Sequence, residues 1–247
     1  MARLSVNVNK IALLRNTRRT GVPDLDRFAT LAHAAGAHGL TVHPRPDERH
    51  IRRDDAYRLA ALMAAWRPGF EFNIEGYPDA PFMELIAEIR PEQCTLVPDA
   101  PGVLTSDEGW RLDAAQQPVA RDAIAALHRV GCRAILFVDP DPEVVARARD
   151  AGADGIEIYT GGYAAACREG HPEALLRLCA ETAAEASRLG LVVNVGHDLN
   201  LDNLPALVAA LPNLKEASIG HELTADALLM GWTAAIHAYR DALAPVA

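Results

Sequence analysis

Lysine is almost missing from this chain, which has only Lys10 and Lys215, so nearly all of its basic residues are arginines. The acidic residues outnumber the basic ones and give a formal net charge of -9, which argues against a non-specific nucleic-acid surface. The sequence also lacks a run of about 18 apolar residues and the apolar core of a signal peptide. We therefore expect neither a membrane-spanning helix nor export, and we predict a cytoplasmic protein.

Several motifs that carry chemistry are absent as well. The four cysteines show no Cys-x-x-Cys spacing and predict reduced thiols; they are Cys94, Cys132, Cys167 and Cys179. No Gly-x-Gly-x-x-Gly turn follows the first predicted strand, which disfavours a dinucleotide fold. No Gly-x-Ser-x-Gly elbow is present, and no two histidines have a short ligand spacing such as His-x-x-x-His.

The apolar periodicity alternates between strands and helices along the whole chain. It predicts strands at 4–9, 39–43, 70–75, 93–97, 133–138, 154–158, 191–195 and 215–219. It predicts helices at 24–35, 53–66, 81–89, 118–130, 142–151, 172–189, 201–211 and 220–242. Eight such units without a linker indicate an α/β protein, a single-domain (β/α)₈ TIM barrel over residues 1–247; an open doubly wound sheet is the alternative.

A second pattern supports the barrel. Strands of a parallel sheet that are buried on both faces usually read as unbroken apolar runs. Here one parity of several strands is polar, and in a barrel that parity would point inward; its members include Ser5, Asn7, Asn9, Thr41, His43, Glu71, Asn73, Glu75, Glu157, Asn194 and Ser218. Buried carboxylates and amides are costly unless they bond to each other or to a ligand, so we interpret this face as partly functional.

The acid–base candidates lie at or near strand ends, where barrel enzymes place their active sites. They are His43, Glu157 and His197, together with Glu71, which has inward parity but sits near the start of its strand. Histidine and an inward glutamate suit proton transfer, because burial and neighbouring charges can bring both close to neutral pH. A hydrogen-bonded structural role is the alternative for any one of them.

Anion-binding groups form a further pattern. Gly196-His197 and Gly220-His221 follow the last two predicted strands, where barrels often bind phosphate through backbone N–H groups. A second anion could be held from the other side by Arg18, Arg45, Arg49 and His50. Metal binding is a competing but less favoured use of the histidines and Glu71.

Taken together, these motifs resemble the pyridoxine 5′-phosphate synthase family of vitamin B6 biosynthesis. The resemblance covers nearly the whole chain and is strongest at 6–16 (VNVNKIALLRN), 41–51 (TVHPRPDERHI), 157–161 (EIYTG), 194–197 (NVGH) and 219–221 (IGH). It implies a (β/α)₈ barrel assembled as a homo-octamer, a tetramer of dimers, that needs no metal and no organic cofactor. It also implies condensation of 3-amino-2-oxopropyl phosphate with 1-deoxy-D-xylulose 5-phosphate to pyridoxine 5′-phosphate, phosphate and water.

The resemblance assigns roles to individual residues. His43, Glu71 and His197 match the family's catalytic residues. Arg45 and His50 match binders of the deoxyxylulose phosphate. The remaining substrate-binding positions are Asn7, Asn9, Lys10, Arg18, Thr105, Glu157, Asp198, Gly220 and His221. Thr105 falls in the long aperiodic stretch 99–113, which we interpret as a loop that closes over the site.

Two departures from the family pattern bear on the reaction. Asn9-Lys10 replaces the Asp-His of much of the family at positions that contact the deoxyxylulose substrate, and an imine-forming role for Lys10 is a less favoured reading. An insertion lies around 77–81, after the strand that carries Glu71. The rivals to the family reaction are another metal-free isomerase or aldolase of sugar phosphates and a non-catalytic protein that binds phosphorylated metabolites.

Overall fold

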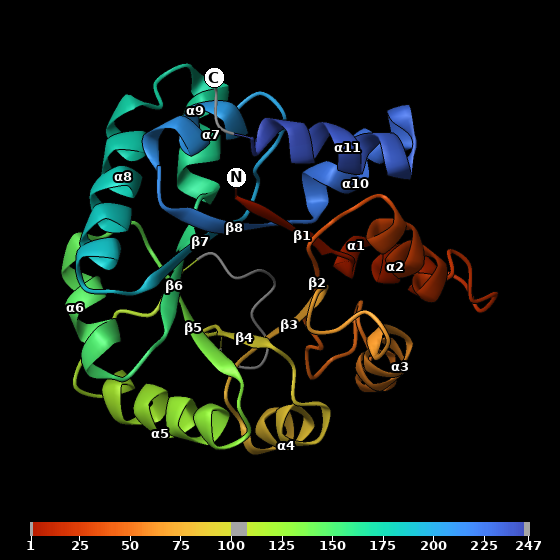
Figure 1. The fold of residues 1–247 in the computed structure, drawn as a ribbon, viewed down its shortest axis with the longest axis horizontal. Coiled ribbons are helices and arrows are strands. Elements are labelled where there is room, and N and C mark those ends of the chain that lie inside the picture. The colour runs from red at the N-terminus through yellow and green to blue at the C-terminus, as the bar shows by residue number, and fades with distance from the viewer. Residues whose placement is uncertain (1, 100–107, 245–247) are drawn as a thin grey trace.

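The strands close into a parallel barrel in sequence order, with β8 pairing β1 (Figure 1). The computed structural model describes residues 2–99 and 108–244. Its strands are β1 (Arg3–Asn7), β2 (Gly39–Val42), β3 (Glu71–Gly76), β4 (Gln93–Leu96), β5 (Arg133–Val138), β6 (Gly155–Tyr159), β7 (Val192–Gly196) and β8 (Leu214–Ile219). The predicted (β/α)₈ barrel is therefore confirmed, and the open sheet is ruled out because β1 and β8 are hydrogen-bonded neighbours.

Helices surround this barrel on its outer face, as Figure 1 shows. They are α1 (Asn9–Asn16), α2 (Leu25–Ala34), α3 (Arg53–Met63), α4 (Ala80–Ile89), α5 (Gln116–Arg129), α6 (Pro142–Asp150), α7 (Gly161–Glu169), α8 (Glu173–Arg188), α9 (Leu204–Ala210), α10 (His221–Met230) and α11 (Trp232–Ala242). Three of them begin at an aspartate whose side chain accepts a backbone N–H of the first turn: Asp24, Asp79 and Asp141. These caps explain why the helices start where the sequence predicts them.

The two parities of the strands face different surroundings. Apolar residues such as Leu4, Val6 and Phe72 point outward and are fully buried under the helices. The inward parity carries a polar ladder instead, as the pattern predicts. Ser5 Oγ lies 2.7 Å from Thr41 Oγ1, and Asn73 Nδ2 donates to the same Thr41 oxygen at 3.3 Å. These three side chains thus satisfy one another from strand to strand, whereas the buried Asn194 Oδ1 of β7 has no hydrogen-bond partner among the described residues.

Three local features differ from the sequence expectations. Residues 9–16 form helix α1, where a strand end and a loop were expected, and α7 occupies the expected turn at 160–163. The final helix is interrupted at Gly231, whose φ of +88° lies in the left-handed region that favours glycine. None of the helices that the structure describes has the length and apolar character needed to cross a membrane.

Candidate active site

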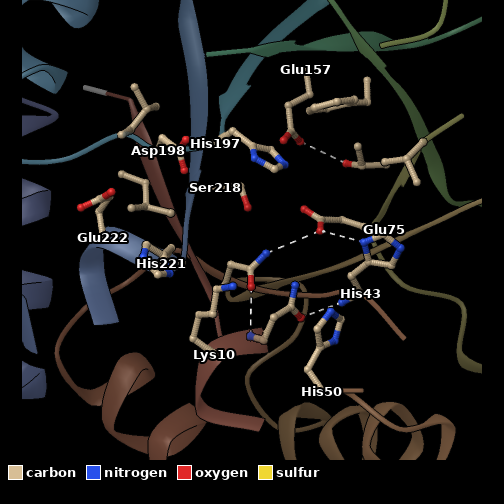
Figure 2. Close-up of a pocket in the computed structure, with 18 of the residues that line it drawn as sticks. Lys10, His43, His50, Glu75, Glu157, His197, Asp198, Ser218, His221 and Glu222 are labelled. Carbon is tan, nitrogen blue, oxygen red and sulfur yellow. Dashed lines mark hydrogen bonds and ion pairs between the residues drawn. The ribbon is translucent and has the colours of Figure 1, made fainter. Parts of the chain in front are cut away.

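A pocket of about 360 Å³ opens at the carboxyl ends of the strands. Its polar lining comes from strands β1, β3, β4, β6 and β8 and from the segments that follow β1, β2, β7 and β8. These residues are Asn7, Asn9, Lys10, His43, Arg45, Arg49, His50, Glu75, Thr95, Glu157, His197, Asp198, Ser218, His221 and Glu222. Its apolar lining includes Leu13, Val97, Phe137, Leu199 and Ile219. Figure 2 shows the side chains of Glu75, Glu157 and His197 directed into one common space.

Glu75, near the end of β3, is the central carboxyl of this pocket. Its Oε2 lies 3.8 Å from His43 Nδ1 and accepts a hydrogen bond from Asn7 Nδ2 at 3.5 Å (Figure 2). Burial raises the pKa of Glu75 to about 8; the charge of Arg45 opposes this shift, and nearby carboxylates reinforce it. Glu75 therefore holds a proton at neutral pH and can serve as an acid.

His43 and His50 are the imidazoles on the same side. The backbone N–H of His43 donates to Asn9 Oδ1 at 2.9 Å, which fixes the end of β2 against the start of α1. Burial, followed by the charge of Arg45, lowers the pKa of His43 well below its usual value. Burial and the neighbouring arginines lower the pKa of His50 to about 4. Both rings are therefore neutral at neutral pH and can accept a proton.

His197 approaches the pocket from the opposite side, at the end of β7. Its ring lies between two aromatic rings, with centroid distances of 5.5 Å to Phe137 and 5.2 Å to Tyr159. Both His197 and Asp198 have left-handed backbones, with φ of +81° and +56°. Burial lowers the pKa of His197, although the charge of Asp198 acts in the opposite direction. His197 is thus a second neutral imidazole, placed across the cavity from His43.

Glu157 lies deeper in the same space. Thr95 Oγ1 is 3.4 Å from its Oε2, and burial together with the charge of Glu75 raises the pKa of Glu157 well above its usual value. A Cβ at position 196 would collide with Glu157 Oε1, so Gly196 leaves room for this carboxyl. The pocket therefore contains two carboxyl groups that favour the protonated form.

The position of Glu71 corrects the sequence prediction. Glu71 is the first residue of β3, at the opposite end of the barrel, and it does not line the pocket. Its carboxylate is paired with Arg3 and Arg133. Glu71 and Glu75 share the inward parity but are four residues apart, or roughly 13 Å along a strand. Of the two glutamates of β3, only Glu75 lines the pocket.

Comparison with known proteins decides the family. Residues 4–245 match the family model described as "Pyridoxal phosphate biosynthesis protein PdxJ". The chain belongs to this family. A pyridoxine 5′-phosphate synthase of Albidiferax ferrireducens is 50% identical over 98% of this chain and 97% of its own length. The pyridoxine 5′-phosphate synthase of Porphyromonas gingivalis is 50% identical over 99% of this chain and 100% of its own length.

Solved structures with low sequence identity share the fold of this chain. Tryptophan synthase from M. tuberculosis matches with a TM-score of 0.65 at 13% identity, covering 98% of this chain and 94% of that one. The YdjI aldolase from Escherichia coli K12 matches with a TM-score of 0.63 at 9% identity, covering 98% and 88%. These likenesses concern the barrel alone.

Most positions that the resemblance to the PdxJ family singled out meet in this pocket. Besides His43 and His197, the structure places there Asn7, Asn9, Lys10, Arg45, His50, Glu157, Asp198, Gly220 and His221. Arg18 is exposed and lies outside this lining, and Thr105 falls outside the residues that the structure describes. Gly220 permits a close approach, because a Cβ there would lie 3.0 Å from Asn7 Cβ.

Residues 77–81, where the resemblance predicts an insertion, border the site. A second cavity of about 590 Å³ adjoins the first, and the two share His43, Arg45 and Arg49. Tyr77 and Pro81 line this second cavity, so this segment shapes the rim of the site. Among residues 2–99 and 108–244, no group of three or more His, Cys, Asp or Glu side chains is arranged to hold a metal ion.

Sequence reasoning missed several residues of the pocket. Phe137, Ser218 and Glu222 line the pocket, and Phe137 packs against His197. Tyr159 packs against the same ring from outside the lining. Glu75 and Ser218 carried a usable signal, because both belong to the inward polar parity and stand closer to the carboxyl end of their strands than Glu71 does.

Proposed function

We propose that this chain catalyses the synthesis of pyridoxine 5′-phosphate from 3-amino-2-oxopropyl phosphate and 1-deoxy-D-xylulose 5-phosphate. The observation that carries the proposal is the meeting of His43, Glu75 and His197 in one pocket that has arginines on one side and the N-terminus of α10 on the other. The names of its curated relatives, at about 50% identity over nearly the whole chain, support the same reaction.

The reaction requires several proton transfers. Imine formation, enolisation, loss of phosphate and loss of water each move a proton to or from a carbon, nitrogen or oxygen atom. The neutral imidazoles of His43 and His197 accept protons on opposite sides of the substrates. Glu75 holds a proton that it can give to a departing hydroxyl, and His43 Nδ1, 3.8 Å away, can restore it. The differing proton affinities of these groups divide acid and base roles among them.

Two phosphorylated substrates need two anion sites. On one side, Arg45, Arg49 and His50 line the pocket from the loop after β2. On the other side, Gly220 and His221 stand at the N-terminus of α10, where backbone N–H groups and the helix dipole favour an anion. We assign the deoxyxylulose phosphate to the first side and the amino-ketone phosphate to the second, as the resemblance implies. Lys10 adds a fixed positive charge between them and replaces the family's titrating imidazole.

Assembly and location remain parts of the proposal. We propose a homo-octamer, a tetramer of dimers. Leu228 and Leu229, at the end of α10, support a subunit contact because they are 78% and 88% exposed. Light scattering of the purified protein measures the mass that decides this. A cytoplasmic location fits substrates whose phosphate charges prevent free passage through membranes.

The experiment is a turnover assay with both substrates and no added metal, following pyridoxine 5′-phosphate and free phosphate together. The proposed reaction predicts both products in equal amounts and none when either substrate is omitted. Turnover of a single sugar phosphate would identify an isomerase or aldolase instead. Tight binding without product would indicate a non-catalytic relative.

A further inference from the structure

Helix α1 and the loop between β2 and α3, which both supply pocket residues, are joined by hydrogen bonds at both ends of the helix. Helix α1 supplies Asn9 and Lys10, and the loop between β2 and α3 supplies Arg45, Arg49 and His50. At the pocket end, Asn9 Oδ1 accepts the backbone N–H of His43 at 2.9 Å.

At the far end of α1, its last residue, Asn16, is hydrogen-bonded to the same loop. Asn16 Nδ2 lies 2.7 Å from the carbonyl oxygen of His50, 3.1 Å from that of Arg49 and 3.3 Å from that of Glu48. The side chain therefore holds three consecutive residues of the loop by their backbone. This stretch has no helix or strand ladder to hold it, and Glu48 has a φ of +51°.

A buried ion pair orients Asn16. Arg15 donates to both carboxylate oxygens of Asp55, at 2.6 and 2.7 Å, and both side chains are buried. Arg15 also donates to Asn16 Oδ1, at 3.1 Å from Nε and 2.9 Å from the second terminal nitrogen. With Oδ1 engaged by a guanidinium, the amide N–H₂ group of Asn16 must face the loop carbonyls.

Asp55 is itself fixed at the start of α3. Its Oδ2 accepts the backbone N–H of Arg52 at 2.9 Å. Burial alone would raise the pKa of Asp55, but hydrogen bonds from Arg15 and Arg52 lower it below the usual value. The carboxylate is therefore charged at neutral pH, and the chain of contacts from α3 through Arg15 to Asn16 stays intact.

We propose that Asn16, oriented by the Arg15–Asp55 ion pair, is a positioning residue that sets the placement of Arg49 and His50 and thereby the affinity for the phosphorylated substrate on that side of the pocket. Asn16, Arg15 and Asp55 do not line the pocket, so they act through the loop backbone. The choice of substrate rests on the proposed function.

The test replaces Asn16 with alanine and, separately, with leucine, which keeps the approximate shape but has no hydrogen-bonding groups. We expect the KM for the deoxyxylulose phosphate to rise about fivefold to tenfold, as loss of backbone hydrogen bonds predicts. We expect kcat and the KM for the amino-ketone phosphate to stay within about twofold. Asn213→Ala is the matched control, because Asn213 is exposed and precedes β8 at the other end of the barrel.

A merely structural role gives a different result. It would lower the melting temperature and the active fraction of the variants while leaving both KM values unchanged, and that outcome overturns the proposal. If the wild-type protein makes no product, the proposed function fails, and calorimetric titration with inorganic phosphate then tests the positioning role. Weaker phosphate binding by Asn16→Ala than by the wild type supports that role. Equal binding, or no binding by the wild type, overturns it.

Discussion

Two glutamates on the same face of strand β3 have different surroundings. Glu75 stands in the pocket beside His43, and burial raises its pKa to about 8. Glu71 stands at the other end of β3, where Arg3 and Arg133 pair with its carboxylate. The surroundings of each side chain, rather than its type or parity, determine what it contributes.

This pair gives a matched experiment. Glu75→Gln keeps the shape of the side chain but removes its proton exchange, so we expect kcat to fall 10²- to 10⁴-fold with the fold intact. Glu71→Gln should leave kcat within about twofold and lower stability by about 1–2 kcal/mol, because two arginines lose a charged partner. Steady-state kinetics and urea unfolding of both variants measure the difference. The reverse pattern would restore the catalytic role predicted for Glu71.

The depth of a residue along a strand explains why the sequence predicted Glu71, and not Glu75, as the glutamate of the pocket. The inward parity repeats every second residue, so Glu71, Asn73 and Glu75 satisfy the same pattern. Chain direction places Glu75 nearer the carboxyl end, but how deep each side chain lies in the barrel depends on the position of the strand relative to its neighbours. That position comes from the pairing of Glu71 with Gly39 and of Gly76 with Leu96, which are contacts between strands distant in sequence. The positions of His43 and His197 were easier to predict from the sequence. Pro44 follows His43 and Gly196 precedes His197, and both residues mark strand ends.

At the scale of elements, the turn after β7 depends on the strand beside it. His197 and Asp198 both have left-handed backbones, which cost about 1–2 kcal/mol each for residues with a Cβ. The buried Thr160 hydroxyl lies 2.6 Å from the carbonyl oxygens of both Gly196 and His197, and its single hydrogen is shared between them. Asn203 Nδ2 donates to Asp198 O at 3.1 Å from the other side. These contacts hold the imidazole in the pocket.

The hydroxyl of Thr160 can be tested by an isosteric pair. Thr160→Val leaves two buried carbonyl oxygens without this donor, so we expect kcat to fall at least about tenfold with little change in either KM. Thr160→Ser keeps the hydroxyl and should retain most of the activity. Kinetics of the two variants side by side make the comparison. Equal kcat values would show that the hydroxyl does not position His197.

Periodicity predicted the strand–helix alternation well but missed features that depend on tertiary packing. Helix α1 is short and polar at its start, and its contacts with the β2–α3 loop hold it in place. Helix α7 begins with Gly161 and Gly162, which have low helix propensity, so the sequence indicates a turn there. The break at Gly231 lies within an otherwise continuous helical pattern. For α1, contacts with a segment distant in sequence outweigh local preference, whereas the break at Gly231 uses the left-handed conformation that glycine favours.

At the scale of the whole molecule, buried carboxyl groups run through the barrel interior. Glu216 of β8 accepts a hydrogen bond from Gln93 at 3.1 Å, and burial raises its pKa from 4.5 to about 7. The folded state therefore binds this proton more tightly than the unfolded state does. The stabilisation is complete below pH 4.5 and is lost as the pH rises through 7.

Glu216→Gln removes this dependence, because glutamine keeps the acceptor for Gln93 but does not ionise. We expect the variant and the wild type to have similar stability near pH 4.5, and the variant to be more stable at pH 8 by about 2–3 kcal/mol. Urea unfolding midpoints across this range measure the divergence. Parallel curves for the two proteins would mean that Glu216 ionises in the fold as easily as in the unfolded chain.

The pairing of β1 with β8 also determines when a newly synthesised chain can complete its pocket. Strand β1 is complete at Asn7, but its partner β8 ends only at Ile219. While the ribosome adds the residues between them, the outer edge of β1 has no partner. Gly220, which packs against Asn7, arrives directly after the closing strand. A nascent chain that already carries His43, Glu75 and His197 therefore still lacks one wall of the pocket, and binding competence comes with the last strand.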